Sequence, residues 1–233
     1  MENIAVALAV PAADGNGAWV DVSGMGRRKT ITVTGAFVGS VTIQVGNDSL
    51  AGTNFCALHT FNGPGQKSFD VACEIMRVSL SGYLSGAPTV DVGGADEGVQ
   101  ASAIAPPVGD GVGVALDTSL YGLFKTFIIA GAWTGVVTIE VSEDNADWQA
   151  LKSFTKSYVM MSAEVSSRYF RIRRSGNSAG TPVVYVAAVN DDEHMTNVFG
   201  NGYDGDVTLV ANIALGRDMY YRTLKTAGYD IAL

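Results

Sequence analysis

Residues Lys29 to Val45 read KTITVTGAFVGSVTIQV. A second copy, KTFIIAGAWTGVVTIEV, runs from Lys125 to Val141, an offset of 96 residues. Matches continue on both sides of this pair, and the offset drifts by two or three residues downstream, as loop insertions would cause. An internal repeat of this kind indicates two copies of one domain.

The repeat divides the chain into five parts. The matched residues place the first repeat at 15–95 and the second at 111–190. Between them, residues 96–110 are predicted to be a linker, since they are rich in proline, glycine and alanine. Residues 1–14 are expected to form an N-terminal arm or an edge strand, and residues 191–233 a short C-terminal β extension.

Apolar and polar residues alternate within each copy. Val41, Ile43 and Val45 would share one face of a strand, with Thr42 and Gln44 on the other. Neither repeat sustains a helical period, and short strands separated by glycine-rich turns are typical of a β-sandwich or small barrel. The predicted fold class is all-β, with two tandem β-sandwich repeats, either immunoglobulin-like or jelly-roll.

The composition suits a globular protein that does not bind nucleic acid. Of the 233 residues, 47% are hydrophobic and 16% are charged, so the chain can bury a core. The formal net charge is −8, from 15 Lys and Arg against 23 Asp and Glu. Because a nucleic-acid binder needs a basic surface, this balance argues against DNA, RNA or an anionic membrane as the partner. No window approaches the apolar length that spans a membrane.

Cysteines and aromatic residues have mainly structural interpretations. Cys56 and Cys73 are expected to be buried thiols, with a disulfide as the alternative. Phe55 and Trp148 occupy equivalent strand positions and are predicted to fill the two cores, with stacking on a sugar as the alternative.

Glycines bracket the turn in the middle of the repeated stretch. Gly35 and Gly39 in the first copy, like Gly131 and Gly135 in the second, predict a tight hairpin. Trp133 lies in the second of these turns, where it would either contact a partner or fold back over the edge of the sandwich.

The sequence predicts no catalytic residue, no metal site and no cofactor. His59 and His194 do not form a zinc spacing, and Cys56 beside His59 lacks an orienting third group. Acidic clusters could hold calcium, although solvated loop acids are the expected interpretation; they lie at 143–147, 191–193 and 204–206. Arg171 and Arg173 make a basic spot that would pair with an acidic neighbouring subunit or lie on a solvated strand face.

The C-terminal segment carries a resemblance to a known group of proteins. It contains DGDVT at residues 204–208, then RDMYY at 217–221, then a short glycine-containing strand. This order resembles a motif of tailed-bacteriophage virion proteins, and the GxxxGxVTIxV pattern of the repeats resembles modules of phage structural proteins. Asn201 and Tyr203 depart from the motif, which covers about the last 35 residues and ends after about one β-helical rung.

The resemblance implies an interface in this segment. A single rung cannot bury its own apolar face, so the segment is expected to pack against its copies in a homotrimer or to dock on a neighbouring shell protein. The alternative is a terminal strand that closes the second sandwich. The candidate interface residues of this segment are Tyr220, Tyr221, Leu224, Arg217 and Asp218. Three further candidates lie in the second repeat: Trp133, Arg171 and Arg173.

The resemblance also implies a function. It predicts a non-enzymatic virion protein on the outer surface of the capsid, a decoration or cement protein or the base of a head fibre, whose partner is the major capsid protein or another virion protein. One alternative is a tail, baseplate or host-adhesion component. A second, from another class, is a glycan-binding β-sandwich module.

Overall fold

The computed structural model describes residues 3–47 and 54–189, and every described element is a strand. The described residues contain no helix long and apolar enough to cross a membrane. The first repeat consists of β1 (Asn3–Leu8), β2 (Gly15–Asn16), β3 (Val20–Asp21), β4 (Met25–Thr34), β5 (Phe37–Gly46), β6 (Phe55–Phe61), β7 (Gly65–Asp70), β8 (Ile75–Gly86) and β9 (Thr89–Asp96). The second consists of β10 (Val99–Ala103), β11 (Gly111–Val112), β12 (Leu116–Asp117), β13 (Phe124–Ala130), β14 (Val136–Ser142), β15 (Gln149–Phe154), β16 (Val159–Glu164), β17 (Tyr169–Ser175) and β18 (Val183–Val189).

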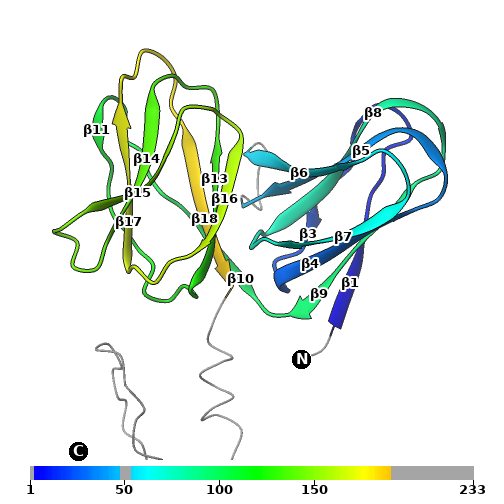
Figure 1. Ribbon diagram of the computed structural model, residues 1–233, viewed down its shortest axis with the longest axis horizontal. Helices are drawn as coiled ribbons and strands as arrows, with labels where there is room; N and C mark the ends of the chain where they lie inside the picture. The colour runs from blue at the N-terminus through cyan, green and yellow to red at the C-terminus, as the bar shows by residue number, and fades with distance from the viewer. Residues whose placement is uncertain (1–2, 48–53, 190–233) are drawn as a thin grey trace, which may run out of the picture. The chain divides into compact units, whose positions relative to one another are not determined.

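Each repeat is a sandwich of two antiparallel sheets, seen as two layers of strands in Figure 1. In the first repeat, sheet A has the order β1-β9-β4-β7 and sheet B the order β2-β8-β5-β6, with β3 also paired to β8. In the second repeat, sheets C and D repeat both orders strand for strand, as β10-β18-β13-β16 and β11-β17-β14-β15, with β12 paired to β17. With β2 and β3 as one interrupted strand, each repeat has eight strands in the jelly-roll order, so the predicted all-β tandem sandwich is confirmed and its type is jelly-roll.

Two strands lie outside the repeat boundaries expected from the sequence. β1 lies within the predicted N-terminal arm and pairs along its full length with β9. β10 lies within the predicted linker and pairs in the same way with β18. The first and last strands of each jelly roll are therefore neighbours, and the connection between the two repeats is shorter than residues 96–110.

The glycine-bracketed turns are not hairpins, so that prediction was wrong. β4 pairs with β7 and β9, whereas β5 pairs with β6 and β8, so residues 35–36 carry the chain from one sheet to the other. Gly35 has φ of +79°, and a Cβ there would lie 2.4 Å from the carbonyl oxygen of Ala87. A glycine is required because this reversal needs both a left-handed backbone and close approach of a neighbouring chain.

Alternation places one face of each strand in the core between the two sheets. In the first repeat, Val41, Ile43 and Val45 of β5 are buried, as the sequence predicted. In the second repeat, β13 breaks this pattern, because all but its first residue are buried. Phe127 and Ile129 face the core of their own jelly roll, while Ile128 and Ala130 join the apolar cluster of the first repeat. Along β13, sheet C is thus buried on both faces, and its outer face there packs against the first repeat.

We expect Ile128→Thr to lower the free energy of unfolding by about 2 kcal/mol, because it removes buried apolar atoms and buries a hydroxyl. Threonine is the residue that the first repeat has at this position, Thr32, which is only half-buried. The matched control, Thr32→Ile, should change stability by less than about 0.5 kcal/mol. Urea unfolding followed by circular dichroism measures both, and equal effects would contradict the double burial of sheet C.

Candidate functional site

Each repeat contains a fully buried lysine at the start of the repeated stretch. Lys29 Nζ donates hydrogen bonds to the carbonyl oxygens of Met25 (3.1 Å), Gly26 (2.8 Å) and Val71 (3.1 Å). Burial lowers the pKa of Lys29, since an ammonium group loses its hydration there. These bonds tie the chain that enters β4 to the chain that leaves β7.

Lys125 does the same in the second repeat. Its Nζ donates to the carbonyl oxygens of Gly122 (2.9 Å) and Val165 (2.8 Å), which correspond to Gly26 and Val71. It also lies over the ring of Phe170, 5.5 Å from the centroid. We call the pinned segments the lysine corner: residues 22–29 with 71–74 in the first repeat, and 118–125 with 165–168 in the second.

The lysine corner of the first repeat packs on the second repeat, beside a second contact in which Phe55 of β6 lies against the ring of Tyr158. The backbone amide of Ala72 donates a hydrogen bond to Thr126 Oγ1 at 3.0 Å, and both residues are fully buried. At the rim, Arg27 Nη1 lies 2.9 Å from Glu164 Oε1, and its guanidinium lies over the ring of Phe124. The corner is therefore a docking element, with a hydrogen bond at its centre and an ion pair at its edge.

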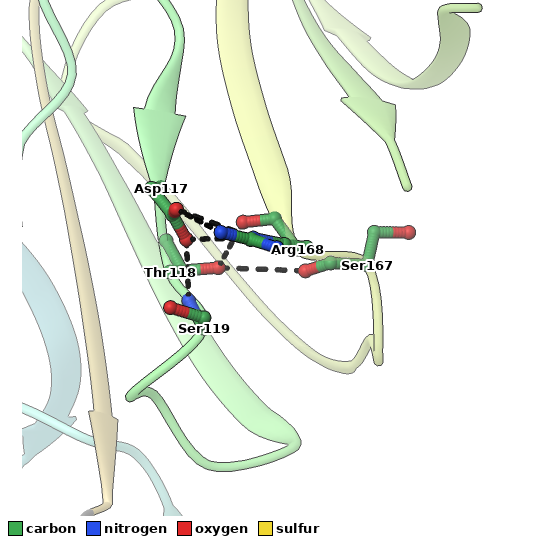
Figure 2. Close-up of polar contacts among 5 residues, drawn as sticks. All are labelled: Asp117, Thr118, Ser119, Ser167 and Arg168. Atoms are coloured by element: carbon green, nitrogen blue, oxygen red, sulfur yellow. Dashed lines mark hydrogen bonds and ion pairs between the residues drawn. The ribbon is translucent and has the colours of Figure 1, made fainter. Parts of the chain in front are cut away.

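The corner of the second repeat holds a network of its own, drawn in Figure 2. The Asp117 carboxylate accepts hydrogen bonds from Arg168, at 2.8 Å from Nη2, and from the backbone amide of Ser119 at 2.9 Å. Thr118 Oγ1 donates to the carbonyl oxygens of Ser167 and Arg168. The hydrogen bonds from Arg168 hold the pKa of Asp117 down to about 2, so the carboxylate stays ionised at neutral pH.

The predicted basic spot lies on the outer face of sheet D, where it is partly neutralised within the chain. Arg171 Nε donates to Glu140 Oε2 at 2.7 Å, and Arg173 Nε donates to Glu140 Oε1. The guanidinium of Arg171 also stacks on Trp148, 4.0 Å from the ring centroid. The two arginines therefore share one buried carboxylate, which lowers their value as a free cationic patch.

The first repeat has a related stack on the outer face of sheet B. Arg77 Nε donates to Gln44 Oε1 at 2.6 Å, and its guanidinium lies over both Trp19 and Phe55. Phe55 and Trp148 are thus half-buried against arginines outside the cores, and the prediction that they fill the cores was wrong. Side chains alternate along β6, so Phe55 must face outward because its neighbour Cys56 faces the core.

Trp133 does not project from its turn. It is half-buried and packs against the apolar core of the second repeat. The ring has folded back over the edge of the sandwich, which was one of the two predicted orientations. Its Nε1 is buried without a hydrogen-bond partner among the described residues.

The side chains with nucleophilic or ligating chemistry have structural environments. Cys56 and Cys73 are free and buried, and burial raises the pKa of the Cys56 thiol to about 12, so it stays protonated at neutral pH. His59 packs edge-on against Phe61, with ring centroids 4.8 Å apart. Asp144 accepts the backbone amides of residues 146 and 147 and so closes its own turn. Within residues 3–47 and 54–189, His, Cys, Asp and Glu form no group that could hold a metal ion.

Several predicted site residues lie outside the described residues: Arg217, Asp218, Tyr220, Tyr221, Leu224, His194 and the acidic clusters at 191–193 and 204–206. The structure adds the two lysine corners, which the sequence interpretation missed. One signal for them was present, since both copies of the repeated stretch begin with the same Lys-Thr pair.

Comparisons with known proteins leave the function open. No protein-family model matches the chain, and no curated protein is similar to it. Among solved structures, PBSX exported protein XepA is similar with 10% identity and a TM-score of 0.33, over 80% of this chain and 86% of that one. A conserved protein of unknown function from Pseudomonas aeruginosa PAO1 has 10% identity and a TM-score of 0.27, over 81% and 78%.

A third likeness is to the CUB1-EGF-CUB2 region of human MASP-1/3, at 8% identity and a TM-score of 0.26, over 80% of this chain and 99% of that one. All three TM-scores are below 0.5. These likenesses therefore support neither a common fold nor a common function.

We expect Lys125→Met to lower the free energy of unfolding by about 2 kcal/mol, because two buried carbonyl oxygens lose the donor that holds them. The control Lys152→Met removes an exposed lysine on β15 and should change stability by less than about 0.5 kcal/mol. Thermal or urea unfolding compares them. An unchanged free energy of unfolding in Lys125→Met would contradict this, because it would mean that the cost of burying the ammonium group equals the stabilisation from its hydrogen bonds.

We expect Asp117→Asn to reduce stability at pH 7 by less than about 1 kcal/mol, since both partners of the ion pair are half-exposed. The pKa of Asp117 is about 2 when folded, below the value of about 3.9 for an unfolded chain. Its contribution is therefore present above about pH 4 and is lost as the pH falls toward 2.

The free energies of unfolding of Asp117→Asn and of the parent protein, measured between pH 7 and 2, should accordingly converge at the acid end. Asp91→Asn, at an exposed position on β9, serves as the control and should show no such convergence. A gap between Asp117→Asn and the parent protein that stays constant down to pH 2 would contradict the assigned ion pair.

Proposed function

We propose that the chain is a non-enzymatic structural protein of a tailed-phage virion, a decoration or cement protein on the outer surface of the head. The observation that carries the proposal is the combination of a tandem jelly-roll unit with a C-terminal segment that resembles phage virion proteins. Jelly rolls occur in capsid proteins and also in lectins, so the fold agrees with this role without selecting it.

The packing of the two jelly rolls supports a mechanical role. Sheet C is buried on both faces, and the first repeat joins it through an apolar cluster and the Ala72–Thr126 hydrogen bond. Two sandwiches joined in this way form one larger unit. In this role the protein would bridge adjacent shell subunits, including the major capsid protein, and raise the barrier to their separation.

The chemistry of the described side chains supports a role without catalysis. The Cys56 thiol is protonated at neutral pH, and the arginines of sheet D are paired with Glu140. The net charge of −8 suits a surface that faces away from packaged DNA, since a protein that contacts phosphates is normally basic. We propose that no cofactor is needed and that the protein acts as a homo-oligomer, with a trimer favoured.

Glycan binding is the second candidate, and one observation favours it. The aromatic–arginine stacks on sheets B and D place half-buried rings beside hydrogen-bonding groups, an arrangement that can hold a sugar ring. Trp133 is less suited to this role because its ring packs on the core. A tail, baseplate or host-adhesion component would use the same fold at a different place in the virion.

The test is the copy number of this chain in purified particles, measured by quantitative mass spectrometry on separated heads and tails. A decoration or cement protein should be present in the head fraction at a copy number comparable to the main shell protein. A few copies confined to tails would contradict the head assignment and favour adhesion. Absence from both fractions, with polysaccharide binding that Trp148→Ala abolishes, would replace the virion role with glycan binding.

A further inference from the structure

Inside the chain, one repeat already docks on the other through a defined contact. The Ala72 amide of the first lysine corner donates to the hydroxyl of Thr126 on the outer face of sheet C, at 3.0 Å. That hydroxyl is also hydrogen-bonded to Ser162, at 2.9 Å. Ala72 packs in an apolar cluster with Ala187 and Val189, so small side chains let the two backbones approach closely.

The first repeat carries the same receiving face, on the outer side of sheet A. Strand pairing places Thr30 where the second repeat has Thr126, and Ser68 where it has Ser162. Their hydroxyl groups are again hydrogen-bonded, at 2.8 Å. Small residues surround the pair, as they do in sheet C: Ala5, Gly93 and Ala95. This face is exposed or half-buried within the described part of the chain.

The second repeat carries the same docking corner. Lys125 pins its backbone as Lys29 pins that of the first, and exposed Ser166 takes the place of Ala72. Two large apolar side chains of this corner are exposed, Leu120 to 72% and Leu123 to 57%. These two leucines give the pinned corner an apolar exposed surface, whereas the corner of the first repeat is covered by the second repeat.

We propose that the second lysine corner of one copy docks on the outer face of sheet A of another copy, repeating the contact between the repeats. Ser166 would then face the Thr30 hydroxyl, as Ala72 faces Thr126. Leu123 stands where the first repeat has Arg27, so the rim of this contact is apolar and the Arg27–Glu164 ion pair is not repeated.

Such a contact joins two different surfaces, so it generates a ring or an open row of copies instead of a closed two-fold dimer. The second copy is the occupant that the structure favours, because the chain itself shows the same corner seated on the same face. The proposal does not depend on the virion role, since it concerns only how copies of this chain associate.

Two variants separate the two halves of the contact. Leu123→Glu places a charge in the corner and leaves sheet A intact, whereas Thr30→Arg blocks sheet A and leaves the corner intact. Sedimentation velocity of the full chain over a wide concentration range should show assembly of the parent protein. Each variant should weaken that assembly by about tenfold or more, which corresponds to 1.4 kcal/mol.

The decisive sample is an equimolar mixture of the two variants. Each retains one working half, so the mixture should form a one-to-one dimer that grows no further, which also shows that both variants are folded. The matched controls are Leu84→Glu, an exposed leucine of β8, and Thr60→Arg on the outer face of sheet B, which should assemble like the parent.

Three results would overturn the proposal. The first is a parent chain that sediments as a monomer at every concentration, whatever the reason that its corner does not bind another copy. Both variants could assemble as the parent does. The mixture could also fail to form the dimer although circular dichroism shows folded variants.

Discussion

The structure depends on the burial of one sheet from both sides. Sheet C belongs to the second jelly roll, yet Ile128 and Ala130 on its outer face lie in the apolar cluster of the first. A two-layer sandwich normally leaves its outer faces to solvent, so this burial is an additional stabilising contribution that exists only because two repeats are joined. It makes the pair of repeats a larger unit than either jelly roll alone.

The shape of that contact depends on a polar feature. Lys29 is buried and is held by three carbonyl oxygens, which compensate for its lost hydration. The same bonds fix the start of β4 and the segment after β7, which present Arg27 and Ala72 to the second repeat. Lys125 preserves this arrangement in the second repeat, although the described residues hold no third jelly roll to receive it. The pinned corner is therefore a property of the repeat, and the docking surface follows from it.

The sequence predicted the elements that follow from local alternation and from self-similarity. The repeats, the all-β class and the buried face of β5 needed only the period of two and the match between the copies. The jelly-roll order did not follow, because it depends on which strands pair across long separations, such as β1 with β9. The glycine pattern at Gly35 predicts a hairpin, yet a left-handed glycine suits a reversal within one sheet and a crossing between two sheets equally well.

The docking surface was missed for a different reason. Alternation within one copy does not reveal it, whereas the difference between the copies does: Thr32 and Thr34 of the first repeat stand where the second has Ile128 and Ala130. A change from hydroxyl to apolar side chains on an outward face indicates that a neighbour covers it. Phe55 and Trp148 were placed in the cores because large aromatic rings are usually buried there, whereas arginine stacking covers them equally well at the surface.

The most direct test of this account is the rotational diffusion of the two repeats in the intact chain, measured by ¹⁵N NMR relaxation. If sheet C is sealed by the first repeat, amides of both jelly rolls should report one common correlation time, set by the size of the joined pair. Two different and shorter correlation times would show that the jelly rolls tumble independently, and would contradict the double burial from which the docking surfaces were derived.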